Sequence, residues 1–282
     1  MTGGGTLFVV ATPIGNLGDI TLRALETLRA VPLIAAEDTR LTRRLLDRHG
    51  LDVPLTSFHA KSGPGRMTAL LEHLRGGSDL ALVSDAGTPV VSDPGGELVA
   101  AWAAEGGMVV ALPGPSAVLT AVAVSGVAGP HWTFEGFLPR SGRERRDRLA
   151  RIGADERGAI VFEAPNRVAA TLRELAAICG EDRPGAVCRE LTKLHETVSR
   201  GTLGELAEAA ASGEIPARGE FVLVVGAWAS ARRPAKEPPS LDAARAEVDR
   251  LVAAGASRSE AARRVAATTG LPRRSLYTVP RD

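Results

Sequence analysis

Residues 80–96, LALVSDAGTPVVSDPGG, contain the features that decide the fold. The stretch opens with an apolar run, Leu80–Val83, and then breaks into turn-forming residues that include Asp85 and Asp93. A short apolar run bounded by turn residues is typical of a buried strand in a parallel sheet. Ligands of open α/β sheets bind beyond the carboxyl ends of such strands, and Gly87 would let the backbone approach a ligand there. We therefore predict a ligand-binding loop. The simpler alternative is a strand-to-helix turn in which Asp93 caps the next helix.

The chain around this stretch alternates strands with helices. Strands are expected at residues 7–11, 32–36, 80–83 and 108–112, with amphipathic helices that include residues 21–29 and 67–74. Strands that alternate with helices form a parallel sheet with right-handed crossovers. We place this first α/β domain at residues 1–118.

A second α/β domain is predicted at residues 119–230, after a Pro-Gly breaker. Its expected strands are residues 132–137, 159–163, 186–190, 197–202 and 220–226, with helices at residues 168–179 and 203–211. The short alternating segment at residues 197–202 indicates a mixed sheet. The domain boundary would place the Asp85 loop beside an interdomain cleft, where ligands commonly bind.

The C-terminal part reads as a linker, residues 231–240, followed by a small helical unit, residues 241–282. Three helices are expected there: one ending at Gly255, one capped by Ser257 and one opened by Pro272. Residues 232–282 hold 11 Lys and Arg against 6 Asp and Glu, although the whole chain has a net charge of only +1. A basic unit that resembles a helix-turn-helix predicts a polyanionic partner; a helical cap on the second domain is the alternative.

Composition narrows the class of protein. Hydrophobic residues make up 44% of the chain and charged residues 24%, with no apolar run of transmembrane length and no convincing signal peptide. Two cysteines favour a reducing cytoplasm over a disulfide scaffold. The sequence has no Walker A motif, no HExxH, no GxSxG and no zinc-type spacing, so we expect no metal site.

Eight motifs in order carry a family resemblance over nearly the whole chain. They are ATPIGNLGDIT (11–21), EDTRLTRRLL (37–46), SFHAKSG (57–63), SDAGTPVVSDPG (84–95), PGPSAV (113–118), FEGFLPR (134–140), FEAPNR (162–167) and RELTKLHE (189–196). Together they resemble the bacterial 16S rRNA (cytidine-2′-O)-methyltransferases, a branch of the tetrapyrrole methylase superfamily, the class III methyltransferases. The loop at residues 13–18 departs from the Gly-x-Gly-x-Gly loop of the tetrapyrrole branch.

The resemblance implies a fold, a cofactor and partners. Two α/β domains would bind S-adenosylmethionine in the cleft between them, and the protein would act as a cytoplasmic homodimer on 16S rRNA of the 30S subunit, with no membrane partner. Cofactor contacts are expected at Asp85, Ala86, Gly87, Val90, Pro115, Ser116, Ala117, Phe162, Leu191, Glu220 and Phe221.

Polar residues in motif positions are predicted to contact RNA, because arginine pairs well with phosphate. They are Arg40, His59, Arg140, Asn166, Arg167, Arg189 and Lys193. The segment from Arg140 to Arg151 holds six arginines and reads either as an RNA-facing arm or as a solvated helix. Arg43 and Arg44 are expected to serve only a capped helix with internal ion pairs.

Methylation of a ribose hydroxyl requires a group that accepts its proton. Asp38 and Glu190 stand at predicted strand ends, one from each domain, and either is a candidate. Glu190 is favoured because Arg189 to Glu196 is the densest run of ionisable groups, although a structural ion pair is the simpler role for each acid.

Two other functions remain open at this point. One is methylation of a tetrapyrrole, such as a precorrin or uroporphyrinogen, and the other is non-catalytic nucleic-acid binding by the C-terminal helices.

Overall fold

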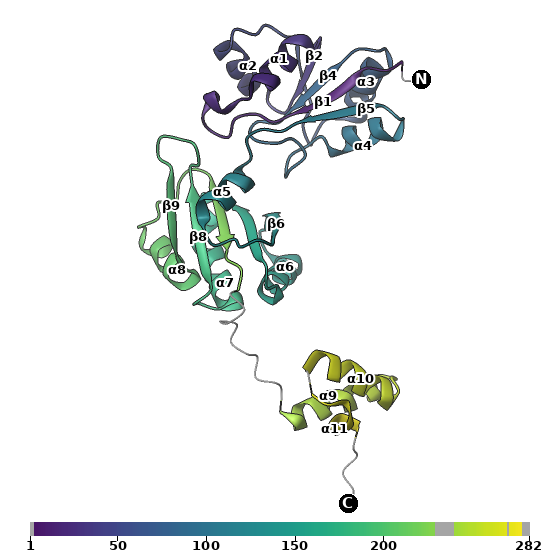
Figure 1. The fold of residues 1–282 in the computed structure, drawn as a ribbon, viewed down its shortest axis with the longest axis vertical. Coiled ribbons are helices and arrows are strands. Elements are labelled where there is room, and N and C mark those ends of the chain that lie inside the picture. The colour runs from purple at the N-terminus through teal and green to yellow at the C-terminus, as the bar shows by residue number, and fades with distance from the viewer. Residues whose placement is uncertain (1–2, 229–239, 270, 278–282) are drawn as a thin grey trace, which may run out of the picture. The chain divides into compact units, whose positions relative to one another are not determined.

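The computed structural model describes residues 3–228, 240–269 and 271–277. The chain divides into two compact units, Met1–Trp228 and Ala229–Asp282, each with its own hydrophobic core (Figure 1). Within the described residues, no helix has both the length and the apolar character needed to cross a membrane.

The first sheet of the large unit is fully parallel. Its strands are β1 (Thr6–Val10), β2 (Leu33–Ala36), β3 (Leu55–Ser57), β4 (Leu80–Val83) and β5 (Met108–Leu112). They lie in the order β3-β2-β4-β1-β5, so β4, the strand before the Asp85 loop, is central. The predicted parallel α/β architecture is confirmed, and β3 is an additional edge strand.

Helices cover both faces of this sheet. On one face lie α1 (Leu22–Ala30) and α2 (Thr39–Arg48), packed on residues such as Val10 and Ile34. On the other lie α3 (Pro64–Arg75) and α4 (Gly96–Ala104), packed on Leu7 and Leu82. A short 3-10 helix, Leu17–Asp19, precedes α1. Burial on both faces explains why β4 is apolar at every position.

The second sheet is mixed, as predicted. Its strands are β6 (Trp132–Phe137), β7 (Gly158–Glu163), β8 (Pro184–Arg189), β9 (Thr197–Thr202) and β10 (Phe221–Val225), in the order β6-β7-β10-β8-β9. Only the β6–β7 pair is parallel.

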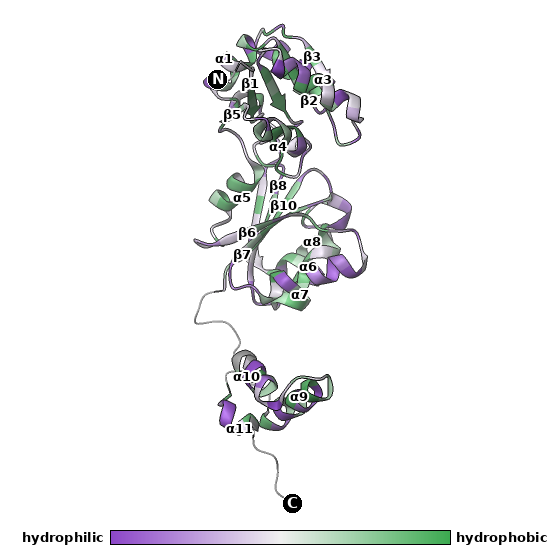
Figure 2. Ribbon diagram, turned by 90° about the vertical axis from the view of Figure 1, so that its right-hand side faces the viewer, coloured by the Kyte–Doolittle hydropathy of each residue, from purple (hydrophilic) through white to green (hydrophobic). Residues whose placement is uncertain are grey.

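The helices of this half also occupy both faces. α6 (Gly142–Ala154), α7 (Val168–Cys179) and α8 (Leu203–Ser212) pack on one face, and a 3-10 turn, Pro165–Arg167, leads into α7. On the other face lies α5 (Ala117–Ser125), which is hydrophobic along its length (Figure 2). The predicted domain boundary at residues 118/119 falls inside the first turn of α5, whose contacts are with β8, β9 and β10.

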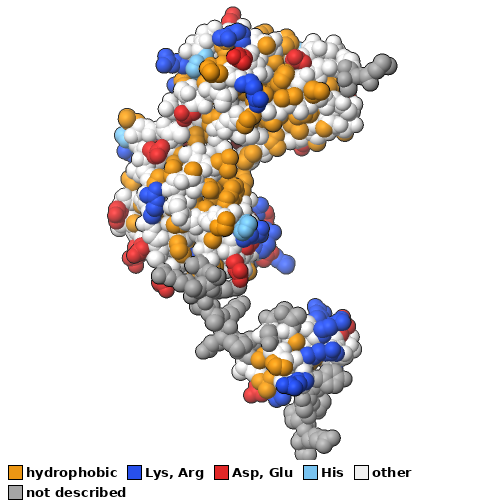
Figure 3. All heavy atoms as spheres, viewed as in Figure 1, with side chains coloured by type: hydrophobic (Ala, Val, Ile, Leu, Met, Phe, Trp, Pro, Cys, Tyr) orange, Lys and Arg blue, Asp and Glu red, His pale blue; other side chains and the backbone are white. Residues whose placement is uncertain are grey.

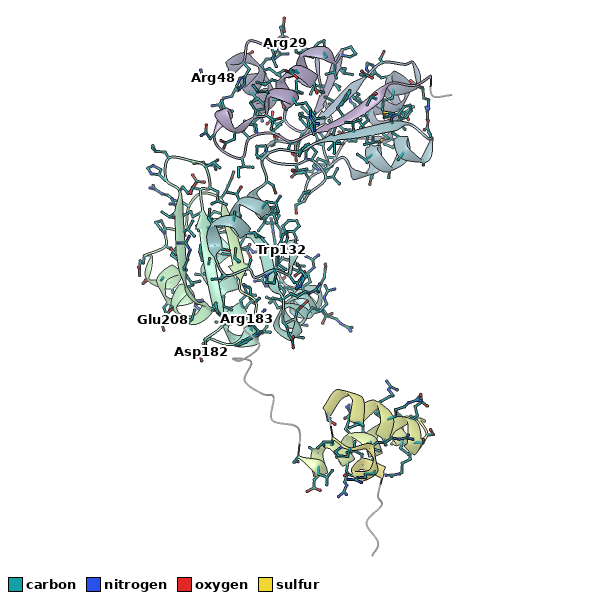
Figure 4. All side chains as sticks on the ribbon, viewed as in Figure 1. Arg29, Arg48, Trp132, Asp182, Arg183 and Glu208 are labelled. Atoms are coloured by element: carbon teal, nitrogen blue, oxygen red, sulfur yellow. The ribbon has the colours of Figure 1, made fainter. Side chains whose placement is uncertain are left out.

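Arg183 lies at the end of the second sheet that is away from the first sheet, and it stabilises this end through hydrogen bonds (Figure 4). Its side chain is fully buried and donates to the carbonyl oxygens of Gly226 at 2.9 Å and Arg157 at 2.8 Å. The guanidinium also lies 5.3 Å from the ring centroid of Trp228. Hydrogen bonds to carbonyl oxygens satisfy the donors of a cation that would otherwise be costly to bury.

The small unit contains three helices, α9 (Leu241–Ala253), α10 (Arg258–Thr269) and α11 (Arg273–Tyr277). Ser240 caps α9, and the hydroxyl of Ser257 accepts from the backbone N–H of Glu260 at 3.3 Å. A core that includes Val248, Val265 and Leu276 holds them together. The predicted helical unit is therefore present, whereas residues 231–239 of the predicted linker lie outside the described residues.

Candidate functional site

A cavity of about 410 Å³ lies where the carboxyl ends of the first sheet's strands meet the second sheet. Nine of the eleven residues predicted to contact a cofactor line it: Asp85, Ala86, Gly87, Ser116, Ala117, Phe162, Leu191, Glu220 and Phe221. Of the other two, Val90 precedes the lining residue Val91, and the carbonyl of Pro115 accepts from the hydroxyl of Thr88 at 3.3 Å.

The loop after β4 is held against the loop after β1. Thr12 and Gly87 exchange backbone hydrogen bonds of 2.8 and 3.0 Å, and the Thr12 hydroxyl donates to the carbonyl of Ser84 at 3.1 Å. Gly87 has φ +81°, which few residues with a side chain adopt. This pairing fixes the backbone of Asp85–Gly87 at the cavity wall.

Asp93 does not cap α4, contrary to the simpler alternative. The N-cap of α4 is Gly95, with φ +117° and no side-chain cap. A Cβ on Gly95 would lie 2.6 Å from a methyl of Leu82, so only glycine fits at this position. Asp93 instead lines the cavity and hydrogen-bonds to Ser84.

Three carboxylates, Glu37, Asp85 and Asp93, line the cavity together. Burial raises the pKa of Glu37 above its usual value, and the negative charges of Asp85 and Asp93 raise it further. Burial likewise raises the pKa of Asp93, with a further contribution from Asp85. Like charges in a partly desolvated site favour a cationic ligand that would neutralise them.

The wall from the second sheet is apolar and aromatic. The ring of Phe162 packs edge-on against Phe134 and Phe137, with centroid separations of 5.0 and 5.5 Å. Phe221 is buried beside it, and burial raises the pKa of the nearby Cys188 thiol to about 11. The cavity therefore offers charged groups on one side and an aromatic surface on the other.

Glu190 and Lys193 form an ion-paired cluster with Glu220. The Lys193 ammonium lies 2.9 Å from a carboxylate oxygen of Glu190 and 3.0 Å from one of Glu220. Glu190 also accepts from the backbone N–H of Glu220 at 2.9 Å. This backbone hydrogen bond and the Lys193 contact hold the pKa of Glu190 below its usual value. Glu190 is not among the residues that line the cavity.

Asp38 is the N-cap of α2. Its side chain accepts from the backbone N–H of Arg40 at 2.8 Å and pairs with the Arg40 guanidinium at 2.5 Å. Its own N–H donates to Asp85 at 2.8 Å. The Arg40 side chain lowers the pKa of Asp38 to about 2.

The sequence profile of the Tetrapyrrole (Corrin/Porphyrin) Methylases matches residues 6–207 of this chain. That match includes all of the first sheet, four of the five strands of the second sheet and every residue of the first-sheet wall of the cavity. The chain belongs to the tetrapyrrole (corrin/porphyrin) methylase family.

Curated relatives of this methylase extend over nearly its whole length. Proteins called ribosomal RNA small subunit methyltransferase I are 46% identical in Synechocystis sp., with 97% of this chain and 96% of that protein aligned. The protein of this name in Xylella fastidiosa is 45% identical, with 97% of this chain and 98% of that protein aligned. The one in Bacillus subtilis is 40% identical, with 97% of this chain and 93% of that protein aligned.

Solved structures share the fold of this methylase at low sequence identity. A diphthine synthase aligns with a TM-score of 0.60 and 16% identity over 79% of this chain and 90% of that chain. The uroporphyrin-III C-methyltransferase of Thermus thermophilus was solved with S-adenosyl homocysteine. It aligns with a TM-score of 0.56 and 18% identity over 79% of this chain and 97% of that chain.

Several predicted RNA contacts of the methylase have structural partners. Arg189 is only 5% exposed and donates to the carbonyls of Arg218 at 2.8 Å and His195 at 3.2 Å. Arg167 donates to Leu138 at 2.8 Å and pairs with Glu163. Arg40, His59, Arg140 and Asn166 are exposed, and of these Arg40 also pairs with Asp38.

The arginine-rich segment of the methylase forms helix α6, with Arg140 just before it, and whether this helix faces RNA stays a prediction. Arg145 points inward, donating to Thr171 at 2.8 Å and pairing with Glu174, while Arg140, Arg143, Arg146 and Arg151 are exposed.

Sequence reasoning missed three groups in this methylase. Glu37 and Asp93 line the cavity, although neither was assigned to the site. Arg44 lines a second cavity of about 370 Å³, which shares Ile14, Asp85, Ala86 and Glu220 with the first. Within the described residues, no three His, Cys, Asp or Glu side chains are grouped so that they could hold a metal ion.

Proposed function

We propose that this methylase transfers a methyl group from S-adenosylmethionine to the 2′-hydroxyl of a cytidine in 16S rRNA, within the 30S subunit. The relatives of 40–46% identity, aligned over nearly their full length and named for small-subunit rRNA, support this substrate. The cavity with three carboxylates and an aromatic wall supports the cofactor.

The residues of the first cavity fit S-adenosylmethionine. The cofactor carries a sulfonium and an ammonium, and the carboxylates Glu37, Asp85 and Asp93 can neutralise them. Phe137 and Phe162 offer a surface for its adenine ring. The volume of about 410 Å³ is typical of small-molecule sites, which span about 300–1,000 Å³.

Catalysis by this chain would consist of orientation and exclusion of water. When bound, S-adenosylmethionine supplies a methyl group on a sulfonium sulfur, which an oxygen nucleophile displaces in line. The paired backbone of Thr12 and Gly87 holds the Asp85 loop rigid, so that methyl donor and acceptor can be aligned. Leu191 and Phe221 are buried in the opposite wall and keep solvent away.

The proton acceptor stays a prediction, with Glu190 first and Asp38 second. If Glu190 accepts the proton, Glu190→Gln lowers the single-turnover rate at saturating substrate by about 100-fold or more, the scale of general-base catalysis. Cofactor affinity should not change. Glu208→Gln, an exposed position on α8, is the matched control (Figure 4).

The same comparison applies to Asp38→Asn. Wild-type rates in both variants would exclude these carboxylates and leave His59, His195 or water. The lowered pKa of both acids weakens them as proton acceptors, which makes a structural role the competing explanation.

A homodimer in the cytoplasm is part of this proposal. Met108 on the edge strand β5 and Leu119 on α5 are each 58% exposed, and hydrophobic side chains gather over β5, α4 and α5 (Figure 3). Exposed apolar surface of this kind suits a protein interface. Leu119→Glu should shift the sedimentation of the protein toward the monomer.

The test of the proposed function uses purified 30S subunits that lack the modification. Incubation with the methylase and labelled S-adenosylmethionine, followed by nucleoside mass mapping, should yield 2′-O-methylcytidine in 16S rRNA. Methylation of a precorrin or uroporphyrinogen instead would identify a tetrapyrrole methyltransferase. No binding of the cofactor in calorimetry would favour a non-catalytic RNA-binding protein.

A further inference from the structure

The second cavity has the composition of a nucleotide site. It lies between the loop after β1, the start of α2 and the ion-paired Lys193, and its volume is about 370 Å³. Asp85 and Ala86 line both cavities, so a group in the second lies across one loop from a ligand in the first. A methyl acceptor must occupy such a place.

Arg44 is the cation of this cavity that is available to a ligand. Lys193 is neutralised by Glu190 and Glu220, whereas Arg44 is exposed and has no hydrogen bond or ion pair to any described residue. Its neighbour Arg43 does have partners, Asp52 at 3.3 Å and the carbonyl of Val53 at 3.2 Å. The expectation of ion pairs inside the helix was therefore wrong for both arginines, because Asp52 and Val53 lie outside α2. The Arg44 guanidinium can bind two oxygens of a phosphate.

The exposed face of α2 continues this positive surface. Arg40, Arg44 and Arg48 recur every fourth residue and are all exposed, so they lie along one side of the helix, and Arg40 is paired with Asp38. Like charges at this spacing destabilise a helix. A polyanion lying along the helix would neutralise Arg44 and Arg48.

Two exposed leucines form the apolar side of the cavity. Leu17 is 39% exposed and Leu41 is 42% exposed, and both line it. Exposed leucines beside a single arginine match the two parts of a nucleotide, an apolar base face and a phosphate. Enzymes that act on an extruded nucleotide hold its base between aromatic or apolar side chains.

Building on the proposed function, we propose that the second cavity holds the acceptor nucleotide, unstacked from its neighbours, with its phosphate on Arg44 and its base against Leu17 and Leu41. The ribose then lies at the shared loop, Asp85–Ala86, with its 2′-hydroxyl toward the first cavity.

Kinetics with 30S subunits test the assignment. Arg44→Ala should lower kcat/KM for the 30S subunit about tenfold, the loss of one charged hydrogen-bonded contact. The slope of log(kcat/KM) against log[salt] should become less negative by about one, and the affinity for S-adenosylhomocysteine should stay the same. Leu41→Ser should lower kcat/KM without changing the salt slope. Arg173→Ala, an exposed arginine on α7, is the charge-matched control.

Two results overturn the assignment while the proposed function stands. One is that Arg44→Ala matches Arg173→Ala in kcat/KM and salt slope. The other is that Arg44→Ala weakens S-adenosylhomocysteine binding, which would assign the second cavity to the cofactor.

A direct probe does not depend on turnover. Phenylglyoxal modifies exposed arginines, and peptide mapping resolves Arg44 from Arg173. Cytidine 5′-monophosphate at millimolar concentration, with S-adenosylhomocysteine present, should slow the modification of Arg44 and leave Arg173 unaffected. If phenylglyoxal modifies Arg44 at the same rate with and without the nucleotide, the subsite is overturned. If the nucleotide slows modification of Arg44 but the wild-type protein methylates no rRNA, only the proposed function is overturned.

Discussion

The carboxylates of the first cavity set a balance between stability and ligand binding. Glu37, Asp85 and Asp93 face a common space with no cation among the residues that line it. The raised pKa values of Glu37 and Asp93 show that burial and mutual repulsion oppose their ionisation. At neutral pH these charges therefore lower the free energy of unfolding of the free protein. A bound cationic ligand offsets their repulsion and stabilises the folded state.

Asp93→Asn should stabilise the free protein and weaken cofactor binding. The pKa of Asp93 is raised above 3.8 in the folded protein, so the folded state binds its proton more tightly than the unfolded state. The proton on Asp93 therefore stabilises the fold at pH values below the ordinary pKa of an aspartate. This stabilisation is lost as the pH rises through the raised pKa of Asp93 in the folded protein. Removing the charge should raise the free energy of unfolding at pH 7 by about 1 kcal/mol and weaken S-adenosylmethionine binding about tenfold.

Calorimetry and urea unfolding at several pH values measure both effects. Wild-type affinity for S-adenosylmethionine should fall as pH is lowered through the raised pKa values, because protonated carboxyls no longer attract a cation. Asp93→Asn should show a flatter profile. A less stable variant with unchanged affinity would remove Asp93 from the site.

Ala86→Leu tests the shared wall without disturbing the fold. Ala86 is exposed and lines both cavities, and it lacks the positive φ that makes Gly87 a poor place for a side chain. A leucine there would fill space in both cavities. We expect cofactor affinity to fall at least tenfold with an unchanged melting temperature. Ala103→Leu on exposed α4 surface is the control, and equal affinities in the two variants would contradict the assignment.

At the scale of elements, two loops at the site store backbone strain. Val90 and Ser92 have φ values of +77° and +65°, and Glu190 and Thr192 have +53° and +66°. A β-branched residue in this region is strained, and strain of this kind concentrates where a ligand must be bound. Each loop lies on one side of the first cavity, with Val91 and Leu191 in its lining.

The strain can be measured by two neighbouring substitutions. Val90→Gly removes a side chain from a left-handed conformation and should stabilise the protein by about 1 kcal/mol. Val91→Gly changes an equally exposed valine at negative φ and should destabilise it by a similar amount. Urea unfolding gives both values, and two shifts of the same sign would show that Val90 is not strained.

Much of the arrangement of elements could be predicted because strands with buried faces have a strong apolar signal. β4 and β6 were predicted to the residue, and α7 as well. β3 could not be found, since its three residues are too few to show a strand pattern. α6 was left open because its inward side includes Arg145, so that the helix has no clear apolar stripe.

The site was predictable where it follows directly from a strand end. Asp85 and Gly87 come straight after β4, and the cavity is there. The place of Asp93 in the cavity could not be predicted, because it follows from the fact that Gly95, and not Asp93, is the N-cap of α4. Arg44 was also missed, since its cavity exists only once α2 and the loop carrying Lys193 come together in space.

At the scale of the whole molecule, chemistry and net positive charge reside in different units. Every residue that lines either cavity near Asp85 belongs to Met1–Trp228. Residues 232–282 hold 11 Lys and Arg against 6 Asp and Glu, and the three helices have a core of their own. A basic unit with its own core can add affinity for RNA without taking part in the cavity.

Truncation after Trp228 separates these contributions. The affinity for S-adenosylmethionine should change less than twofold, because the lining of the first cavity is retained. KM for the 30S subunit should rise about tenfold or more, with a less negative dependence of log(kcat/KM) on log[salt], because phosphate contacts that release counterions are lost. Steady-state kinetics between 50 and ~200 mM salt give both quantities.

A full-length variant distinguishes the effect of removing positive charges from the effect of removing the whole small unit. Arg263→Gln combined with Arg250→Gln removes two exposed positive charges from the small unit and keeps its helices. If the unit binds RNA through phosphates, this variant should reproduce part of the loss seen on truncation, with a salt slope between those of the truncated and wild-type proteins. If the helices only cap the fold, the double variant should match the wild type, and the truncated protein should instead lose stability in urea unfolding.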